Sequence, residues 1–113
     1  MAIRQTAIIR VDGSPSIGMG HVARMLSLAD ALRDGGADVE FVTHDDAAAL
    51  REIAGREFAY RIVAGDANGD VLGEEDARFL IERVRSSDAA FVVVDHYGAD
   101  ACYFELEKEA QAV

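Results

Sequence analysis

The chain has 113 residues, half of them hydrophobic and one of them proline, which is the size and composition of a single globular domain rather than of a disordered or fibrous protein. Its 11 basic and 21 acidic residues give a net charge of -10, and the basic residues are scattered singly, which argues against a nucleic acid partner. One cysteine excludes an intrachain disulfide. The N-terminal segment is interrupted by Arg4 and Arg10 and lacks the apolar length of a signal peptide or membrane span. We therefore expect a cytoplasmic protein with no membrane partner.

Four short apolar or β-branched runs, each bounded by glycine, proline or polar residues, predict four β-strands at 7–11, 39–43, 60–63 and 91–94. Between and after these runs, apolar residues recur at helical spacing and predict four helices, through 22–32, 46–54, 74–85 and 101–112. Gly35 and Gly36 end the first helix. Acidic residues open the third helix and arginines close it, as the helix dipole favours.

The alternation of strands and helices predicts an α/β fold, a Rossmann-like (βα)4 unit with a right-handed parallel sheet. Residues 91–94 form the most uniformly apolar run, which predicts a central strand covered on both faces. Because the last predicted element is a helix with no strand after it, we expect 1–113 to be a single N-terminal α/β domain, truncated relative to a two-domain protein. An open sheet edge and an uncovered domain interface would favour a homo-oligomer.

The most informative segment runs from Arg10 to Arg24, across the predicted end of the first strand, a glycine-rich loop and the start of the first helix. Backbone N–H groups at such a helix start favour anions, so the loop is a candidate substrate site. His21 would occupy an exposed position in the first turn, where the dipole keeps the imidazole neutral and able to act as a base; alternatively, it packs or caps the helix. Asp12 could bind a substrate hydroxyl or cap the loop.

Gly18, Gly20 and Ala23 also match the G-x-G-x-x-A pattern of dinucleotide-binding loops. In that pattern the first glycine follows the strand directly, whereas here six residues separate Val11 from Gly18. Asp45 meets only loosely the position of the acidic residue expected after the second strand. We therefore expect no dinucleotide and no other cofactor.

A second polar segment, Asp95-His96-Tyr97-Gly98, directly follows the fourth predicted strand. Open parallel sheets bind ligands at the carboxyl ends of their strands, where the strand order reverses. With the strand order 3-2-1-4, this segment and the loop before His21 would converge on one site. The alternative is a simple turn with Tyr97 packed over it.

A metal site is not predicted. The three histidines, at 21, 44 and 96, come from separate strand ends and lack the spacing of metal ligands. Cys102, in the last predicted helix, has no local base and is interpreted as a small core residue.

Together the two segments resemble the UDP-2,4-diacetamido-2,4,6-trideoxy-β-L-altropyranose hydrolases of pseudaminic acid biosynthesis and the related spore-coat polysaccharide proteins. The resemblance lies in the order and spacing of four elements: Arg10-x-Asp12, Ile17-Gly-x-Gly-His21-x-x-Arg24, Leu-x-Leu-Ala at 26–29, and Asp95-His96-Tyr97-Gly98. Pro15 departs from the pattern and fixes one φ angle of the loop.

The resemblance implies the N-terminal domain of a GT-B glycosyltransferase-like fold, with a C-terminal nucleotide-binding domain as its partner in cis or in trans. It implies a UDP-sugar substrate, His21 as the catalytic residue that assists water in displacing UDP, and an isolated chain without activity. We expect the substrate-binding residues to be Arg10, Asp12, Ser14, Gly18, Gly20, Arg24, Asp95, His96 and Tyr97. A GT-B glycosyltransferase, in which His21 would activate an acceptor hydroxyl, and a non-catalytic binding remnant are the alternatives.

Overall fold

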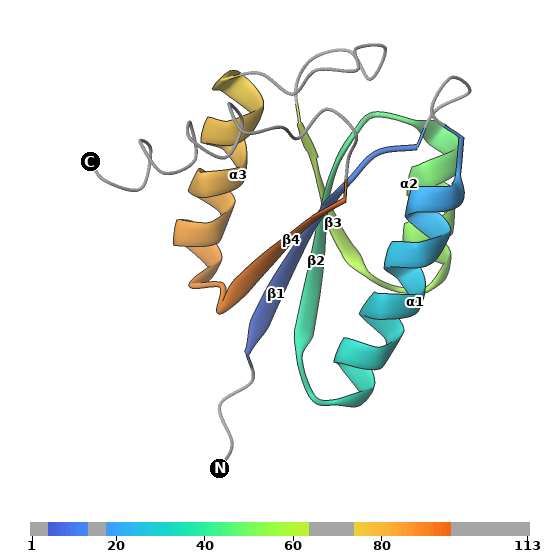
Figure 1. The fold of residues 1–113 in the computed structure, drawn as a ribbon, viewed down its shortest axis with the longest axis horizontal. Helices are drawn as coiled ribbons and strands as arrows, with labels where there is room; N and C mark the ends of the chain where they lie inside the picture. Colours follow the sequence, from blue (N-terminus) through green and yellow to red (C-terminus); the bar gives the residue numbers. More distant parts are fainter. Residues whose placement is uncertain (1–4, 14–17, 64–73, 96–113) are drawn as a thin grey trace.

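The computed structural model describes residues 5–13, 18–63 and 74–95, which form a four-stranded parallel sheet with helices on both faces (Figure 1). In chain order the elements are β1 (Thr6–Val11), α1 (Gly20–Asp34), β2 (Asp38–His44), α2 (Ala47–Gly55), β3 (Ala59–Val63), α3 (Glu74–Ser87) and β4 (Phe91–Asp95). This confirms the predicted α/β, Rossmann-like fold; the last predicted helix, 101–112, lies outside the described residues. None of the helices in the described ranges has the length and apolarity needed to cross a bilayer.

The sheet has the order β3-β2-β1-β4, and all neighbouring strands are parallel. From β1 the chain winds outward to β3 and then returns past β1 to β4, so the order reverses between β1 and β4. At that point the last residue of β1, Val11, lies opposite the last residue of β4, Asp95. Open α/β sheets bind their ligands outside such a reversal, at the carboxyl ends of the strands.

Two separate apolar clusters hold the helices to the sheet, with α1 and α2 on one face and α3 on the other (Figure 1). Because successive residues of a strand point to opposite faces, Ile9 and Val11 pack with α1 and α2, whereas Ile8 packs with α3. The same alternation turns Arg10 towards α3 and Asp95 towards α1. Strand geometry thus places polar residues from the carboxyl ends of the strands on both faces of the sheet.

β4 lies at an edge of the described sheet, and β1 and β2 are its central strands. Phe91 is 40% exposed, and the other four residues of β4 are only partly buried. The prediction of a central strand at 91–94 is therefore wrong for the part of the chain that the structure describes. Side chains of β4 do pack on both faces of the sheet, Val93 with the cluster under α1 and Val92 and Val94 with the cluster under α3. An apolar run makes a strand suitable for burial, but its neighbours in the sheet decide whether it is buried.

The start of α2 carries a side-chain cap that can be tested directly. Asp46 Oδ2 accepts a hydrogen bond of 3.0 Å from the backbone N–H of Ala49, one of the donors that a helix start leaves without a partner. Asp46→Ala is expected to lower the free energy of unfolding by about 1 kcal/mol, measured by urea denaturation. Asp45→Ala, at the exposed neighbouring position, is the control and should be close to neutral. Equal losses in the two variants would contradict the capping role.

Candidate functional site

Three of the predicted site residues, His21, Arg24 and Asp95, come together where α1 begins and β4 ends. His21 Nδ1 lies 2.9 Å from Asp95 Oδ1. The Arg24 guanidinium holds the same carboxylate, with Nε 3.1 Å from Oδ2 and Nη2 2.9 Å from Oδ2 and 3.0 Å from Oδ1. The predicted pairing of the first and fourth strands is confirmed, and this pairing brings Asp95 beside α1.

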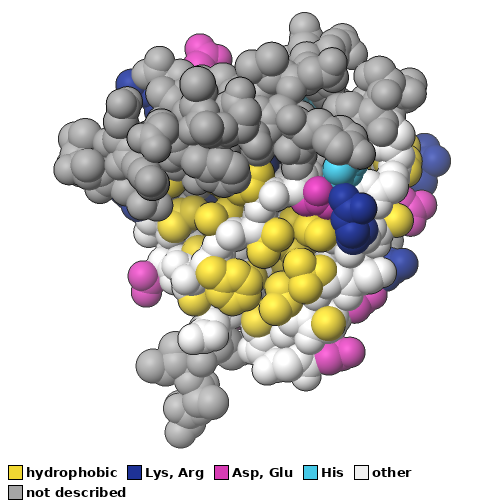
Figure 2. All heavy atoms as spheres, in the orientation of Figure 1, with side chains coloured by type: hydrophobic (Ala, Val, Ile, Leu, Met, Phe, Trp, Pro, Cys, Tyr) yellow, Lys and Arg dark blue, Asp and Glu magenta, His cyan; other side chains and the backbone are white. Residues whose placement is uncertain are grey.

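The three side chains differ strongly in their exposure. His21 is buried, at 8% exposure, so the expectation of an exposed first-turn histidine is wrong; Asp95, at the end of β4, contacts the ring. Arg24 lies one helical turn further along α1 and keeps 60% of its side chain exposed. On the face drawn in Figure 2, histidine, acidic and basic side-chain atoms meet at the surface beside an apolar patch.

The start of α1 has no side-chain cap among the described residues. Met19, at the N-cap position, makes no side-chain hydrogen bond to the helix, and the first turn contains no acidic residue. Two positions before α1 require glycine. Gly18 has a φ of 84°, which L side chains rarely adopt. A Cβ on Gly13 would come within 2.7 Å of Met19 Sδ. The helix start therefore keeps its positive dipole character, and Asp95 is a described carboxylate beside it, through its contacts with His21 and Arg24.

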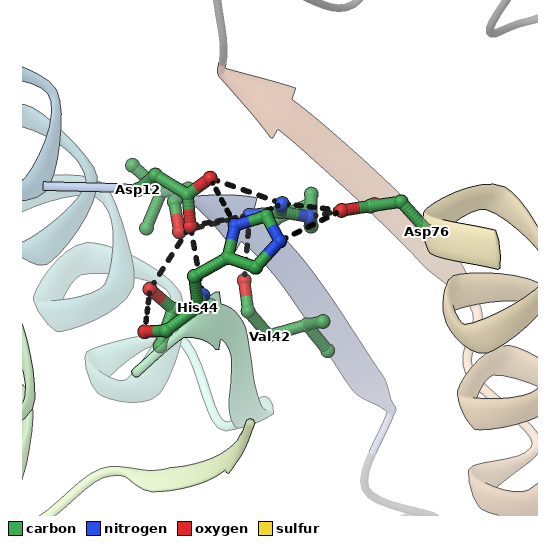
Figure 3. A network of polar contacts seen from close by, with 7 residues as sticks. Asp12, Val42, His44 and Asp76 are labelled. Carbon is green, nitrogen blue, oxygen red and sulfur yellow. Dashed lines mark hydrogen bonds and ion pairs between the residues drawn. The ribbon is translucent and has the colours of Figure 1, made fainter. Parts of the chain in front are cut away.

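Arg10 and Asp12 belong to a different cluster, on the α3 side of the sheet (Figure 3). Arg10 is fully buried and holds two carboxylates with forked pairs of contacts: Nε and Nη2 lie 2.9 Å and 2.6 Å from Asp76, and Nη1 and Nη2 lie 2.9 Å and 3.0 Å from Asp12. Desolvation by burial acts to lower the pKa of Arg10, but the hydrogen bonds and charges of Asp76 and Asp12 together raise it above its ordinary value. Arg10 is therefore a permanent buried cation.

Asp12 joins the carboxyl ends of the two central strands. Its Oδ1 accepts hydrogen bonds from the backbone N–H of His44 at 2.8 Å and from the Thr43 hydroxyl at 3.2 Å. Its Oδ2 lies 2.8 Å from His44 Nδ1, and the imidazole lies between Asp12 and Asp76 in Figure 3. Asp12 is 1% exposed and Arg10 is fully buried, and contact of either residue with substrate stays a prediction.

Two members of this network, His44 and Asp76, are not among the predicted site residues. The acidic start of α3 is explained in the sequence by the helix dipole alone, and His44 gives no ligand spacing. One signal is present in the sequence: an arginine within an otherwise apolar strand, Arg10, has to bring counter-charges into the interior. That signal indicates that partners exist, without identifying them.

The other five predicted substrate-binding residues fall into two groups. Gly18 and Gly20 lie at the start of α1, whereas Ser14, His96 and Tyr97 fall outside the described residues. Within residues 5–13, 18–63 and 74–95, no three His, Cys, Asp or Glu side chains are arranged to hold a metal ion.

Comparison with known proteins supports the fold and does not name a family. A scan against protein-family profiles gives no match, and neither does a search of curated proteins. Among solved structures, the chain is similar to a glycosyltransferase from Rickettsia africae ESF-5, with a TM-score of 0.68 and 13% identity over 94% of this chain and 27% of that one. It is also similar to a formyltetrahydrofolate deformylase from Pseudomonas putida KT2440, with a TM-score of 0.52 and 19% identity over 81% of this chain and 30% of that one.

At these identities the likeness shows the fold alone. The chain spans less than a third of the length of either enzyme. The fold is therefore of a kind that enzymes use, and its similarity to part of a glycosyltransferase agrees with the fold that the sequence resemblance implied.

Proposed function

We propose that the chain is the sugar-facing half of a nucleotide-sugar hydrolase, which releases UDP from an amino-deoxy sugar in surface polysaccharide or nonulosonic acid biosynthesis. The observation that carries the proposal is the 2.9 Å contact between His21 Nδ1 and Asp95 Oδ1 at the point where the strand order reverses. When this carboxylate accepts a proton from Nδ1, the ring keeps its lone pair on Nε2, which is the arrangement of a histidine general base. The likeness to a glycosyltransferase fold supports the same class of substrate.

In the proposed reaction, the oxygen of a water molecule attacks the anomeric carbon while its proton passes to His21 Nε2. The bond between the anomeric carbon and the diphosphate oxygen breaks, and its electron pair leaves with UDP. The guanidinium of Arg24 and the N-terminal end of α1 supply positive charge on the side of the leaving group. Arg10 and Asp12 hold the ends of β1 and β2 in place behind the site without touching the reacting atoms.

The proposal assigns the nucleotide to a second domain, supplied in cis or in trans. The isolated chain is therefore expected to bind UDP weakly, with a dissociation constant well above the micromolar range, measured by isothermal titration calorimetry. A dissociation constant of about 1 μM, or about -8 kcal/mol, would instead place the nucleotide site within this chain. Uridine, titrated in parallel, shows whether any binding that is seen comes from the base or from the phosphates.

The reaction itself is tested with the chain joined to its second domain. The amino-deoxy substrate UDP-2,4-diacetamido-2,4,6-trideoxy-β-L-altropyranose should yield UDP and the free sugar, with UDP-N-acetylglucosamine as the control substrate. Absence of both products in a folded two-domain protein would refute the hydrolase and leave the non-catalytic binding module.

A glycosyltransferase is the second candidate, and the likeness to the Rickettsia africae ESF-5 enzyme favours it. In that case His21 Nε2 would take the proton of an acceptor hydroxyl instead of that of water. Release of UDP would then depend on an added acceptor, and the sugar would be recovered as a glycoside. Identification of the sugar product by mass spectrometry therefore separates the two reactions.

A further inference from the structure

His21 Nδ1 has two partners that require opposite protonation states. Asp95 Oδ1 and Arg24 Nη2 each lie 2.9 Å from this nitrogen. A carboxylate oxygen only accepts, so the first contact needs a proton on Nδ1, whereas a guanidinium only donates, so the second needs Nδ1 to be bare. One nitrogen cannot meet both conditions, and only one of the two contacts can be a hydrogen bond at any moment.

Of the two partners, Arg24 is the one that can leave. Its side chain is 60% exposed, against 18% for Asp95, which also belongs to a strand of the sheet. Because Arg24 is the exposed member of the pair, its guanidinium can turn to another anion without first leaving the protein interior. The start of α1, one helical turn before Arg24, has no described side-chain cap and adds positive dipole character there.

We propose that Arg24 is a positioning residue that sets the tautomer of His21, and that a diphosphate group releases it. While Arg24 holds Asp95, Nδ1 accepts from Nη2 and the ring proton sits on Nε2, so that Nε2 cannot act as a base. When Arg24 turns to a diphosphate, whose paired oxygens fit the guanidinium fork, Asp95 Oδ1 becomes the partner of Nδ1. The ring then loses the Nε2 proton to solvent and gains one at Nδ1, with no change in its charge.

This inference rests on the proposed function and deepens it. Nε2 is free of its proton only when the diphosphate leaving group is bound, so His21 can act as a base only towards a sugar that carries a diphosphate. Arg24 is thereby a determinant of specificity for nucleotide diphosphate sugars over sugar monophosphates and free sugars. The same contact also explains why His21 and Arg24 stand one helical turn apart, both within reach of Asp95.

The test is the tautomer of His21 in the full chain, read from the nitrogen-15 shifts of labelled histidine at alkaline pH, where imidazoles are neutral. The signals of this ring are those that disappear in His21→Gln. We expect the Nε2–H tautomer in the free protein and the Nδ1–H tautomer in Arg24→Met. Arg33→Met, which removes a partly exposed arginine near the other end of α1, is the matched control and should leave the tautomer unchanged.

Inorganic pyrophosphate, added at saturating concentration, should convert the wild type to the Nδ1–H tautomer and cause no further change in Arg24→Met. An Nδ1–H ring in the free wild type, or an Nε2–H ring in Arg24→Met, would overturn the proposal that Arg24 sets the tautomer of His21. A wild-type tautomer that pyrophosphate leaves unchanged would overturn the proposal that a diphosphate releases Arg24 from Asp95. Because this measurement needs no turnover, its failure is distinguishable from failure of the hydrolase proposal, which is judged by UDP release alone.

Discussion

His21→Ala, in the chain joined to the proposed second domain, is expected to lower the rate of UDP release by about two to four orders of magnitude, the usual contribution of a positioned general base. The expected loss is in kcat, because the base acts on water in the transition state rather than on the bound sugar. UDP release from the amino-deoxy substrate is the measurement. His96→Asn, outside the described residues, should reduce the rate less if His96 only supports its loop.

The fold of the His21 variant has to be checked alongside its activity, because His21 is buried against Asp95 and is not a free surface residue. Thermal melts of His21→Ala and of the more polar His21→Asn separate loss of catalysis from loss of structure. Turnover near the wild-type rate in a folded His21→Ala protein would remove His21 from the mechanism. The assignment of the base would then move to the segment Asp95–Tyr97.

Asp76→Asn is expected to cost about 3 to 5 kcal/mol of the free energy of unfolding, because it leaves a buried guanidinium without one of its two carboxylates. Arg10 Nε and Nη2 both lose a charged acceptor in this variant. Since the pKa of Arg10 is raised in the folded protein, its stabilising charge is fully present below the ordinary arginine pKa and is lost only in more alkaline solution. Urea denaturation at neutral pH therefore reports on the fully charged arginine.

Two controls accompany the Asp76 variant. Glu75→Gln, the exposed neighbour on α3, should change the free energy of unfolding by no more than about 0.5 kcal/mol. The double variant Arg10→Met/Asp76→Leu removes the cation together with its partner and should cost less than the sum of the two single changes. Losses that simply add, or an Asp76 variant as stable as the Glu75 control, would refute the network as a coupled unit.

Much of the fold was predictable because side-chain periodicity is a property of the local backbone. Successive strand residues alternate between faces and helical residues recur about every 3.6 positions, so a run such as 6–11 or 38–44 marks its own element wherever it lies in the molecule. All four predicted strands agree with the observed bounds to within one residue at each end. The strand order 3-2-1-4 was a condition of the predicted site; the structure has this order, and it brings His21 and Asp95 together.

The tertiary structure alone decided which side chains meet across elements. Arg10 and Asp76 are 66 residues apart and Asp12 and His44 are 32 apart, and nothing in the local pattern of either partner identifies the other. The exposure of β4 likewise depends on the strands beside it, not on its own apolar sequence. The two competing partners of His21 Nδ1 are likewise a result of packing, because its distances of 2.9 Å to Arg24 and to Asp95 exist only once α1 and β4 are packed together. Local periodicity determines what each element is, whereas a protonation state depends on contacts that only packing creates.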